Sequence, residues 1–415
     1  MRALLPVFSL ALVMAVSGSA QCLSVASEST INGVDYHLWL PETPAHVPCG
    51  NGDLVIYAHG YVTPGLPADA WLNELTIGGV FLPTVLNQAG YAVAASRYRK
   101  TGLAIVEGMQ DTLALANAAH NAAIPGLQSP LHTFLIGASE GGLVTTLSAE
   151  QLHGTYNSAG AACGPIGSFQ GQVNYFGDFR VIFDYFFPGV IPGNPVSPAD
   201  TLAAAAQWPA LSTVAIPTAL ANTSKTQQLF RVMGIPLPGD PSVVLSTVLE
   251  VLAYNIFGTA DAQLELGGQP YDNRGRIYLG SSNDLALNLQ VKRFKADPSA
   301  LANVAAHYET SGRLSTPLVT IHTLSDPVIP YWHEPLYTVK TLFAGDLLQR
   351  INLPVAAYGH CNFTSGDILA AFALMVLRST GSNPTNALRT ALPELRQNEF
   401  DSAMSRHTAA AAAIH

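Results

Sequence analysis

The sequence predicts an α/β protein in which helices flank a mostly parallel sheet and a large, mainly helical segment is inserted into the chain. Two observations lead to this fold class. Short apolar runs typical of buried strands alternate with helical patterns up to about residue 166, and the alternation returns near residue 317. Between these regions, residues 167–313 contain an aromatic cluster and proline-rich turns instead.

Eight segments have the pattern of strands. The first two are joined by Asn32-Gly33, a pair that favours a tight turn. Most of the others are short apolar runs, as expected for strands buried on both faces of a sheet. The expected strands are residues 23–27, 34–40, 53–58, 91–97, 131–136, 157–163, 317–323 and 350–356.

Helical patterns lie between the later strands. In the sheet-forming parts of the chain they cover residues 68–88, 106–121, 142–152, 334–343 and 367–378, and in the insertion they lie near 201–207 and 243–257. We therefore expect five parts: a signal peptide (1–20), a first part of the core (21–166), an inserted cap or lid (167–313), a second part of the core (314–392), and a C-terminal helix with an alanine-rich tail (393–415).

The composition is that of a folded protein and excludes one class of partner. The chain has 415 residues, of which 48% are hydrophobic and 11% charged, so it can bury a large core. Its formal net charge is -9. We expect no nucleic-acid partner, because binding phosphates needs a basic surface. The sequence has no zinc-type Cys/His spacing and no phosphate-binding glycine loop, so we expect no metal and no cofactor.

The N-terminus has the pattern of a cleaved signal peptide. Arg2 is followed by an apolar run from Ala3 to Val16 and then by small residues up to Ala20, near which we expect cleavage. The alternative is an uncleaved anchor, although the run is short for a membrane span. We expect no later run to be long and apolar enough to span a bilayer. We expect a secreted or periplasmic protein without a stable membrane span.

Residues 137–141 (Gly-Ala-Ser-Glu-Gly) fit the pattern Gly-x-Ser-x-Gly between an expected strand and an expected helix. This context is typical of a nucleophilic serine on a sharp strand-to-helix turn, where glycines let the chain fold tightly. Ser139 is the candidate nucleophile. The backbone N–H of Glu140, at the start of the helix, would point toward a developing oxyanion. A plain glycine-rich turn is the alternative.

A serine nucleophile needs a base, and the base needs an orienting acid. Asp326 and His360 each follow an expected strand, so both lie at carboxyl ends of strands, where α/β sheets place their chemistry. They also follow Ser139 in the chain order serine, acid, histidine. We expect Asp326 to be the acid and His360 the base. The alternatives are an Asx-turn before Pro327 for Asp326 and an ordinary loop histidine for His360.

Residues 59–61 (His-Gly-Tyr) follow another strand and complete the expected site. The backbone N–H of Tyr61 is the candidate second donor of the oxyanion hole. We expect His59 to hold this loop by hydrogen bonds. His322 and His333 lie near Asp326 in the sequence, and we expect both to be structural.

Together these residues resemble the α/β-hydrolase superfamily. Within it, the motifs around the acid and the histidine resemble a group of secreted, capped serine hydrolases described as esterases or prolyl-oligopeptidase-like: Gly312-Arg313-Leu314, Pro317-Leu318-Val319, residues 326–330 (Asp-Pro-Val-Ile-Pro) and residues 359–363 (Gly-His-Cys-Asn-Phe). The resemblance covers the catalytic part well and the cap poorly. It implies the three triad roles and no cofactor. Ala138, where some feruloyl esterases and tannases have a cysteine, speaks against those activities.

The four cysteines allow three pairings, or free thiols. We favour Cys163–Cys361, because Cys163 ends one expected strand and Cys361 follows another at the same edge of the sheet. Cys22 and Cys49 flank the first two strands and form the second expected bridge. An even number of cysteines agrees with an oxidising compartment.

The expected activity is hydrolysis of a small-molecule or polymeric carboxylic ester through an acyl-serine intermediate. A serine peptidase or amidase is the first alternative, and a non-catalytic binding protein on the same fold is the second. Phe183 and Phe186 belong to the aromatic run of the insertion and are the candidate substrate contacts. Their alternative is the core of the cap itself. If they line an apolar cleft, we expect a broad esterase.

Overall fold

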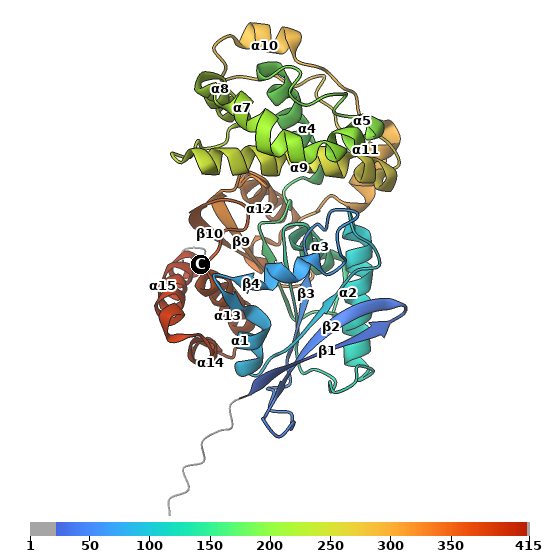
Figure 1. Ribbon diagram of the computed structural model, residues 1–415. Coiled ribbons are helices and arrows are strands. Elements are labelled where there is room, and N and C mark those ends of the chain that lie inside the picture. The colour runs from blue at the N-terminus through green and yellow to red at the C-terminus, as the bar shows by residue number, and fades with distance from the viewer. Residues whose placement is uncertain (1–21, 413–415) are drawn as a thin grey trace, which may run out of the picture.

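The computed structural model describes residues 22–412 and contains an eight-stranded sheet with helices on both faces (Figure 1). The strand order is β1-β2-β6-β3-β7-β8-β9-β10. β2 is antiparallel to both β1 and β6. The neighbouring strands β6, β3, β7, β8, β9 and β10 are all parallel to one another. The predicted signal peptide and the last three residues of the tail lie outside the described residues.

All eight predicted strands are present. The hairpin turn at Asn32-Gly33 is confirmed, and both residues have positive φ (53° and 81°), as tight hairpin turns require. The strands are β1 (Leu23–Ile31), β2 (Val34–Glu42), β3 (Leu54–Ala58), β6 (Ala92–Ser96), β7 (Thr133–Ala138), β8 (Ser158–Ala162), β9 (Leu318–Ser325) and β10 (Arg350–Tyr358).

The sheet is buried because its strands carry apolar side chains on both faces. In β3, Val55 and Tyr57 pack into the core on the side of α1 (Leu82–Gln88) and α13 (Ser365–Thr380). Leu54 and Ile56 point the other way, toward α2 (Ile105–His120) and α3 (Glu140–Gln151). The four helices agree with the prediction, apart from the start of α1, and so does α12 (His333–Ala344).

Two helix predictions are corrected. Residues 68–88 form a short 3-10 helix (Ala70–Leu75), the two-residue strands β4 (Thr76–Ile77) and β5 (Val80–Phe81), and then α1. Gly78-Gly79, both at positive φ, break the predicted helix by turning the chain between β4 and β5. At the C-terminus, α14 (Thr385–Ala391) precedes α15 (Glu394–Ala412) and was not predicted.

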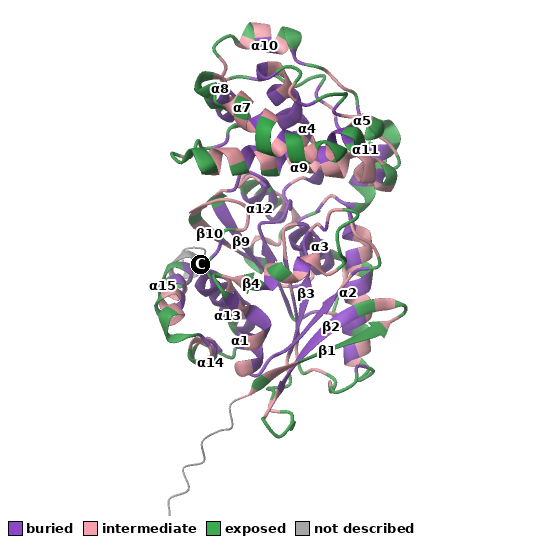
Figure 2. Ribbon diagram, viewed as in Figure 1, coloured by how far each residue is buried: buried purple, intermediate pink, exposed green. Residues whose placement is uncertain are grey.

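The segment between β8 and β9 forms a helical layer above the carboxyl ends of the parallel strands (Figure 1). We call it the helical insertion. Many of its residues are buried (Figure 2), and its apolar side chains form the core of the insertion together with Val328 and Ile329. Its helices are α4 (Phe169–Phe186), α5 (Pro198–Ala206), α6 (Trp208–Ala210), the π-helix Leu211–Ala215, α7 (Ile216–Leu220), α8 (Thr223–Met233), α9 (Pro241–Leu266), α10 (Asp284–Gln290) and α11 (Pro298–His307).

One helix of the described chain, α9, is long and apolar enough by length and composition to span a bilayer, contrary to the expectation from the sequence. In its most apolar window, 33% of the residues are buried. α9 packs against α4, α5 and α11 within the helical insertion. Core helices can pass the same test, so length and composition alone are weak evidence for a membrane span.

Candidate active site

Ser139 lies on a strained turn between β7 and α3. Its backbone has φ 56° and ψ -121°, a conformation that side-chain-bearing residues rarely adopt. The two glycines of the motif explain how the turn closes. A Cβ on Gly137 would lie 2.3 Å from the carbonyl oxygen of Gly141, and one on Gly141 would lie 2.0 Å from that of Ala58. Only glycine fits at both positions.

The structure brings Ser139, His360 and Asp326 together in one chain of hydrogen bonds. His360 Nε2 lies 2.9 Å from Ser139 Oγ, and His360 Nδ1 lies 2.8 Å from Asp326 Oδ2. Asp326 is buried, and its Oδ1 accepts hydrogen bonds of 2.9 Å from the N–H groups of Val328 and Ile329. In this geometry Asp326 holds the imidazole so that Nε2 faces the hydroxyl.

The charges of the pair reinforce each other. Burial alone would raise the pKa of Asp326, but His360 and His322 outweigh it and hold that pKa below its ordinary value. Burial alone would lower the pKa of His360, but the Asp326 carboxylate outweighs it and raises that pKa above its ordinary value. Asp326 is therefore ionised, and His360 takes up a proton readily.

A second histidine, His322, helps to hold the loop that carries Asp326. His322 of β9 is fully buried, and its Nε2 lies 2.8 Å from the carbonyl oxygen of Ile329, while its Nδ1 lies 3.2 Å from Glu334 Oε1. Both partners only accept, so both nitrogens donate and the ring is an imidazolium. The carboxylates of Asp326 and Glu334 outweigh burial and raise the pKa of His322 to about 10.

Arg350 completes this buried network by pairing with Glu334. The two cations, His322 and Arg350, thus balance the two anions, Asp326 and Glu334. Sequence reasoning assigned His322 a structural role and missed Glu334 and Arg350. The available signal was a charged residue at the start of a buried strand, since Arg350 opens β10 and is 3% exposed.

The loop after β3 supplies the other expected parts. Neither the Tyr61 N–H nor the Glu140 N–H donates to another protein group in the described part of the chain. His59 Nδ1 donates to the carbonyl oxygen of Gly60 at 2.7 Å, and its ring stacks between Trp71 and Tyr98. Burial lowers the pKa of His59 to about 4, so this ring is neutral.

Glu74 was not predicted from the sequence. Its Oε2 accepts from the Gly60 N–H at 2.9 Å and from the Tyr57 hydroxyl at 2.8 Å. These bonds fix the loop that carries Tyr61.

The carboxyl group of Glu140, beside Ser139, accepts a hydrogen bond from the Ala104 N–H at 3.0 Å, and burial raises the pKa of Glu140 to about 8. Glu140 is therefore mostly neutral at pH 7.

Both expected disulfides, Cys22–Cys49 and Cys163–Cys361, are present. The second joins the end of β8 to the residue after His360. The sulfur atoms of Cys163 and Cys361 and a nitrogen of His360 are close enough together to suggest metal ligands. Because the two sulfurs are bonded to each other, they are not available as thiolate ligands.

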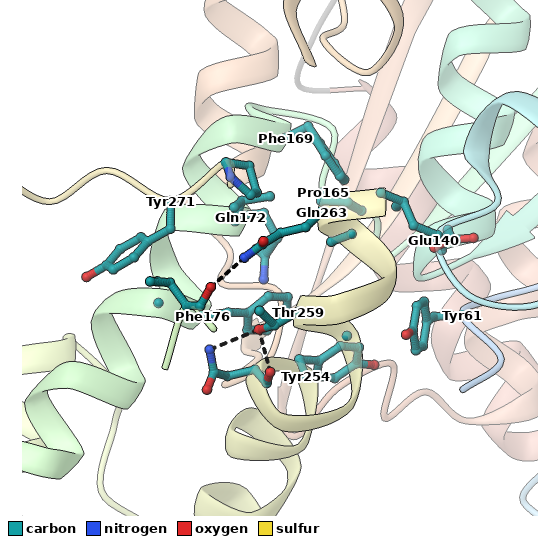
Figure 3. A pocket seen from close by; sticks show the side chains of 18 of the residues that line it. Tyr61, Glu140, Pro165, Phe169, Gln172, Phe176, Tyr254, Thr259, Gln263 and Tyr271 are labelled. Carbon is teal, nitrogen blue, oxygen red and sulfur yellow. Dashed lines mark hydrogen bonds between the residues drawn. The ribbon is translucent and has the colours of Figure 1, made fainter. Parts of the chain in front are cut away.

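Two cavities open at Ser139. A narrow one of about 140 Å³ lies between the sheet edge and helices α4 and α9, and Figure 3 shows its lining side chains, including Phe176, Tyr254, Tyr61 and Glu140. A wider one of about 430 Å³ extends from Ser139 and His360 between the sheet and α13.

The candidate substrate contacts Phe183 and Phe186 line neither cavity, so that expectation is corrected. Both rings are buried in the core of the helical insertion, and Phe183 is 0% exposed. The aromatic residues of the insertion that line the narrow cavity are Phe169, Phe176, Tyr254 and Tyr271. The rings of Phe176 and Tyr254 stack with their centroids 4.6 Å apart.

The sheet order, the turn at Ser139, and an acid and a histidine at the ends of β9 and β10 define an α/β-hydrolase fold. The sequence matches no protein-family model, and no curated protein matches it.

Solved structures similar to this chain include the esterase PF2001 of Pyrococcus furiosus (12% identity, TM-score 0.44, covering 86% of this chain and 92% of that chain). A puromycin hydrolase has 13% identity and a TM-score of 0.41, covering 87% of this chain and 40% of that chain. The rice cell wall degrading esterase LipA of Xanthomonas oryzae has 15% identity and a TM-score of 0.41, covering 87% and 91%.

Proposed function

We propose that the protein is a secreted serine hydrolase that cleaves carboxylic esters, with Ser139 as nucleophile, His360 as base and Asp326 as acid. The observation that carries this proposal is the unbroken chain of hydrogen bonds from Ser139 Oγ through His360 to Asp326. The free N–H groups of Tyr61 and Glu140 support it, because together they would form an oxyanion hole.

In the first half of the reaction, Ser139 Oγ attacks the ester carbonyl carbon and its proton passes to His360 Nε2. The carbonyl oxygen becomes an oxyanion, which accepts hydrogen bonds from the two free N–H groups. The bond from the carbonyl carbon to the alcohol oxygen then breaks. His360 gives its proton to that oxygen, so the alcohol leaves neutral and the acyl group stays on Ser139.

In the second half, a water molecule attacks the acyl carbon and gives a proton to His360 Nε2. The bond between the acyl carbon and Ser139 Oγ breaks, Oγ takes the proton back, and the carboxylic acid leaves. Asp326 stays ionised throughout and stabilises the imidazolium that forms in each half.

The cavities favour an ester over a peptide. Their walls are mostly apolar, whereas recognition of an extended peptide draws on main-chain hydrogen bonds. Secretion is supported by the N-terminal pattern and by the two disulfides, which persist in oxidising compartments.

A fluorophosphonate probe and a matched pair of substrates test the proposal. We expect the probe to label Ser139 in the wild type and to leave Ser139→Ala unlabelled. We also expect p-nitrophenyl butyrate to be hydrolysed much faster than the p-nitroanilide of the same acid. An unlabelled wild type would contradict a serine hydrolase, and faster cleavage of the amide would favour the peptidase or amidase alternative.

A further inference from the structure

The two cavities that meet at Ser139 differ in which part of the site they include. Ser139, Tyr61 and Tyr254 line both cavities. His360 lines only the wide cavity of about 430 Å³, and Glu140 lines only the narrow cavity of about 140 Å³. The rings of Tyr61 and Tyr254, with centroids 5.9 Å apart, stand where the two cavities divide.

Because His360 lines only one of the two cavities, the position of His360 fixes which part of an ester lies in which cavity. The group that leaves Ser139 must receive a proton from His360 Nε2, so its oxygen has to lie within hydrogen-bond reach of that nitrogen. The leaving alcohol is therefore on the side of His360, and the acyl group extends to the other side.

We propose that the wide cavity between the sheet and α13 binds the alcohol part of the ester, and that the enzyme prefers esters of long, apolar alcohols and short acids. This inference rests on the proposed function and adds the substrate class to it.

The wide cavity exists because small residues line it where larger ones would fill it. Ala138, Ala162 and Ala371 contribute only methyl groups. Gly160 instead lets α13 pack closely on β8, because a Cβ there would lie 2.4 Å from the sulfur of Met375.

Much of the wall is apolar, with Ile136, Val319, Ile321, Phe372 and Met375 among its side chains. Glu74 also reaches this cavity, but one of its oxygens is already bonded to the Gly60 N–H and the Tyr57 hydroxyl. A bound alkyl chain would thus replace water against hydrocarbon, which favours binding roughly in proportion to the buried area.

The volumes point the same way. Pockets for drug-sized ligands span roughly 300–1,000 Å³, and the wide cavity falls in this range. The narrow cavity is about the size of an engineered cavity of roughly 150 Å³ that holds benzene. The alcohol side therefore has room for a long chain, and the acyl side has room for a short one.

Two ester series test this orientation in the wild type. One keeps the acid as acetate and lengthens the alcohol from ethyl to decyl. The other keeps the alcohol as ethyl and lengthens the acid from acetate to decanoate. We expect kcat/KM to rise by up to about fourfold per CH₂ along the alcohol series, the factor that corresponds to roughly 0.8 kcal/mol per buried CH₂. We expect the acid series to fall after a few carbons.

A matched pair of variants assigns each series to one cavity. Ala371→Leu fills the wide cavity from α13, and Ala262→Leu fills the narrow cavity from α9. We expect Ala371→Leu to lower the ratio of decyl acetate to ethyl acetate hydrolysis at least tenfold. Ala262→Leu should leave that ratio unchanged and lower the ratio of ethyl butyrate to ethyl acetate hydrolysis. Thermal unfolding checks that both variants fold. If Ala371→Leu does not fold, the smaller substitution Ala371→Val takes its place in the test.

The outcomes separate this inference from the proposed function. Ester hydrolysis that is indifferent to alcohol length, or that rises only along the acid series, overturns the inference and leaves the serine esterase standing. So does an Ala371→Leu variant with the wild-type ratio. If the wild type hydrolyses no ester and takes no fluorophosphonate label, the proposed function fails and the inference fails with it.

Discussion

Ser139 keeps a backbone conformation that costs of the order of 1–3 kcal/mol for a residue with a side chain. Its surroundings impose this conformation. The Ser139 N–H donates to the carbonyl oxygen of Ala162 at 2.9 Å, and the Gly142 N–H donates to the carbonyl oxygen of Ser139 at 3.0 Å. The turn is therefore set by the backbone of β7, β8 and α3, and the hydroxyl is not needed to hold it.

The first prediction follows from this independence. Ser139→Ala should keep the wild-type thermal midpoint and lose at least about 10³-fold in kcat, because triad members act as a unit. Ser148→Ala is the matched control, because it removes the hydroxyl of another serine, which is fully buried in the adjoining helix α3. We expect Ser148→Ala to keep its activity. Near-normal turnover in Ser139→Ala would remove it as the nucleophile.

The second prediction concerns pH. His360 acts as a base only when neutral, and Asp326 raises its pKa above the ordinary value of about 6.5. Activity should therefore rise with pH, and the midpoint of the rise in kcat/KM should lie above 6.5. Asp326→Asn should shift that midpoint to lower pH and reduce kcat by about 10⁴-fold, because the orienting carboxylate is lost. A flat wild-type profile from pH 5 to 8 would contradict His360 as the base.

At the scale of secondary structure elements, β9, β10 and α12 meet in the buried network of His322, Glu334 and Arg350. This network positions the end of β9, from which the Asp326 loop begins. The imidazolium of His322 is fully enclosed, and its two N–H groups reach α12 and the Asp326 loop at once.

A third prediction follows for stability. The pKa of His322 is about 10 in the folded protein and about 6.5 in an unfolded chain. Its contribution to stability is therefore fully present below pH 6.5 and is lost as pH rises toward 10. We expect the free energy of unfolding to fall over this range in the wild type and to fall less in His322→Gln. The exposed His307→Gln should behave as the wild type. Equal slopes in all three proteins would rule out a buried imidazolium at this position.

A fourth prediction separates two rings of α4. Phe183 is enclosed in the insertion core, so Phe183→Ala should lower the free energy of unfolding by about 3–5 kcal/mol. Phe176 lines the narrow cavity and is partly exposed, so Phe176→Ala should cost less stability and should widen the range of acids accepted. Denaturant unfolding and the acid series measure the two effects. A wild-type acid profile in Phe176→Ala would remove this ring from the substrate site.

These elements show what the sequence could predict. The grouping of Ser139, Asp326 and His360 could be predicted because each follows a parallel strand, and the carboxyl ends of such strands meet at one edge. The rings that line the narrow cavity could not be predicted in this way. Phe176 and Phe183 are seven residues apart and share a face of α4, but about 10 Å along the axis separates them. Only the packing of α9 decides which ring meets a cavity.

The turn at Gly78-Gly79 and the buried contacts of Glu74 and Glu334 were also harder to predict from the sequence. Nothing in the local pattern of residues 68–88 shows that the turn at Gly78-Gly79 places Gly78 in the lining of the wide cavity. Glu74 bonds to Gly60, and Glu334 pairs with Arg350, only because separate segments converge in space. Such contacts depend on tertiary structure and leave no periodic pattern in the sequence.

On the scale of the whole molecule, the two disulfides lie at opposite edges of the sheet. Cys163–Cys361 joins the ends of two segments beside His360, while Cys22 precedes β1 and Cys49 precedes β3 at the amino edge. The first bridge borders the site, and the second joins the start of the N-terminal hairpin to the segment between β2 and β3.

The fifth prediction uses this difference. Replacing Cys22 and Cys49 together by serine should lower the free energy of unfolding by up to about 3.5 kcal/mol, the chain-entropy value for a loop of this length. The variant should keep its kcat, because the bridge is remote from Ser139. Replacing Cys163 and Cys361 should lower kcat as well, since that bridge adjoins His360. Equal kcat in both double variants would show that the bridge beside His360 does not position it.

Hydrogen bonds tie the helical insertion to the Asp326 loop and to the start of α12. The Tyr175 hydroxyl donates to the carbonyl oxygen of Pro327 at 2.5 Å, and the Gln172 side chain donates to that of Val328 at 2.7 Å. His333 Nδ1 accepts from the Gly167 N–H at 3.0 Å. Helix α4 thus helps to hold the Asp326 loop in place and also forms a wall of the narrow cavity.

For protein engineers, this linkage limits how the chain can be recombined. A graft that replaces residues 167–313 with the corresponding segment of another protein of this fold would exchange residues that line the narrow cavity. The same exchange would remove the hydrogen bonds that hold the Asp326 loop. Such chimaeras should lose turnover even on small esters that make few contacts with the cavity walls. Activity should remain only if the donor segment brings its own version of the Asp326 loop. The unit of exchange is therefore the insertion together with residues 326–333.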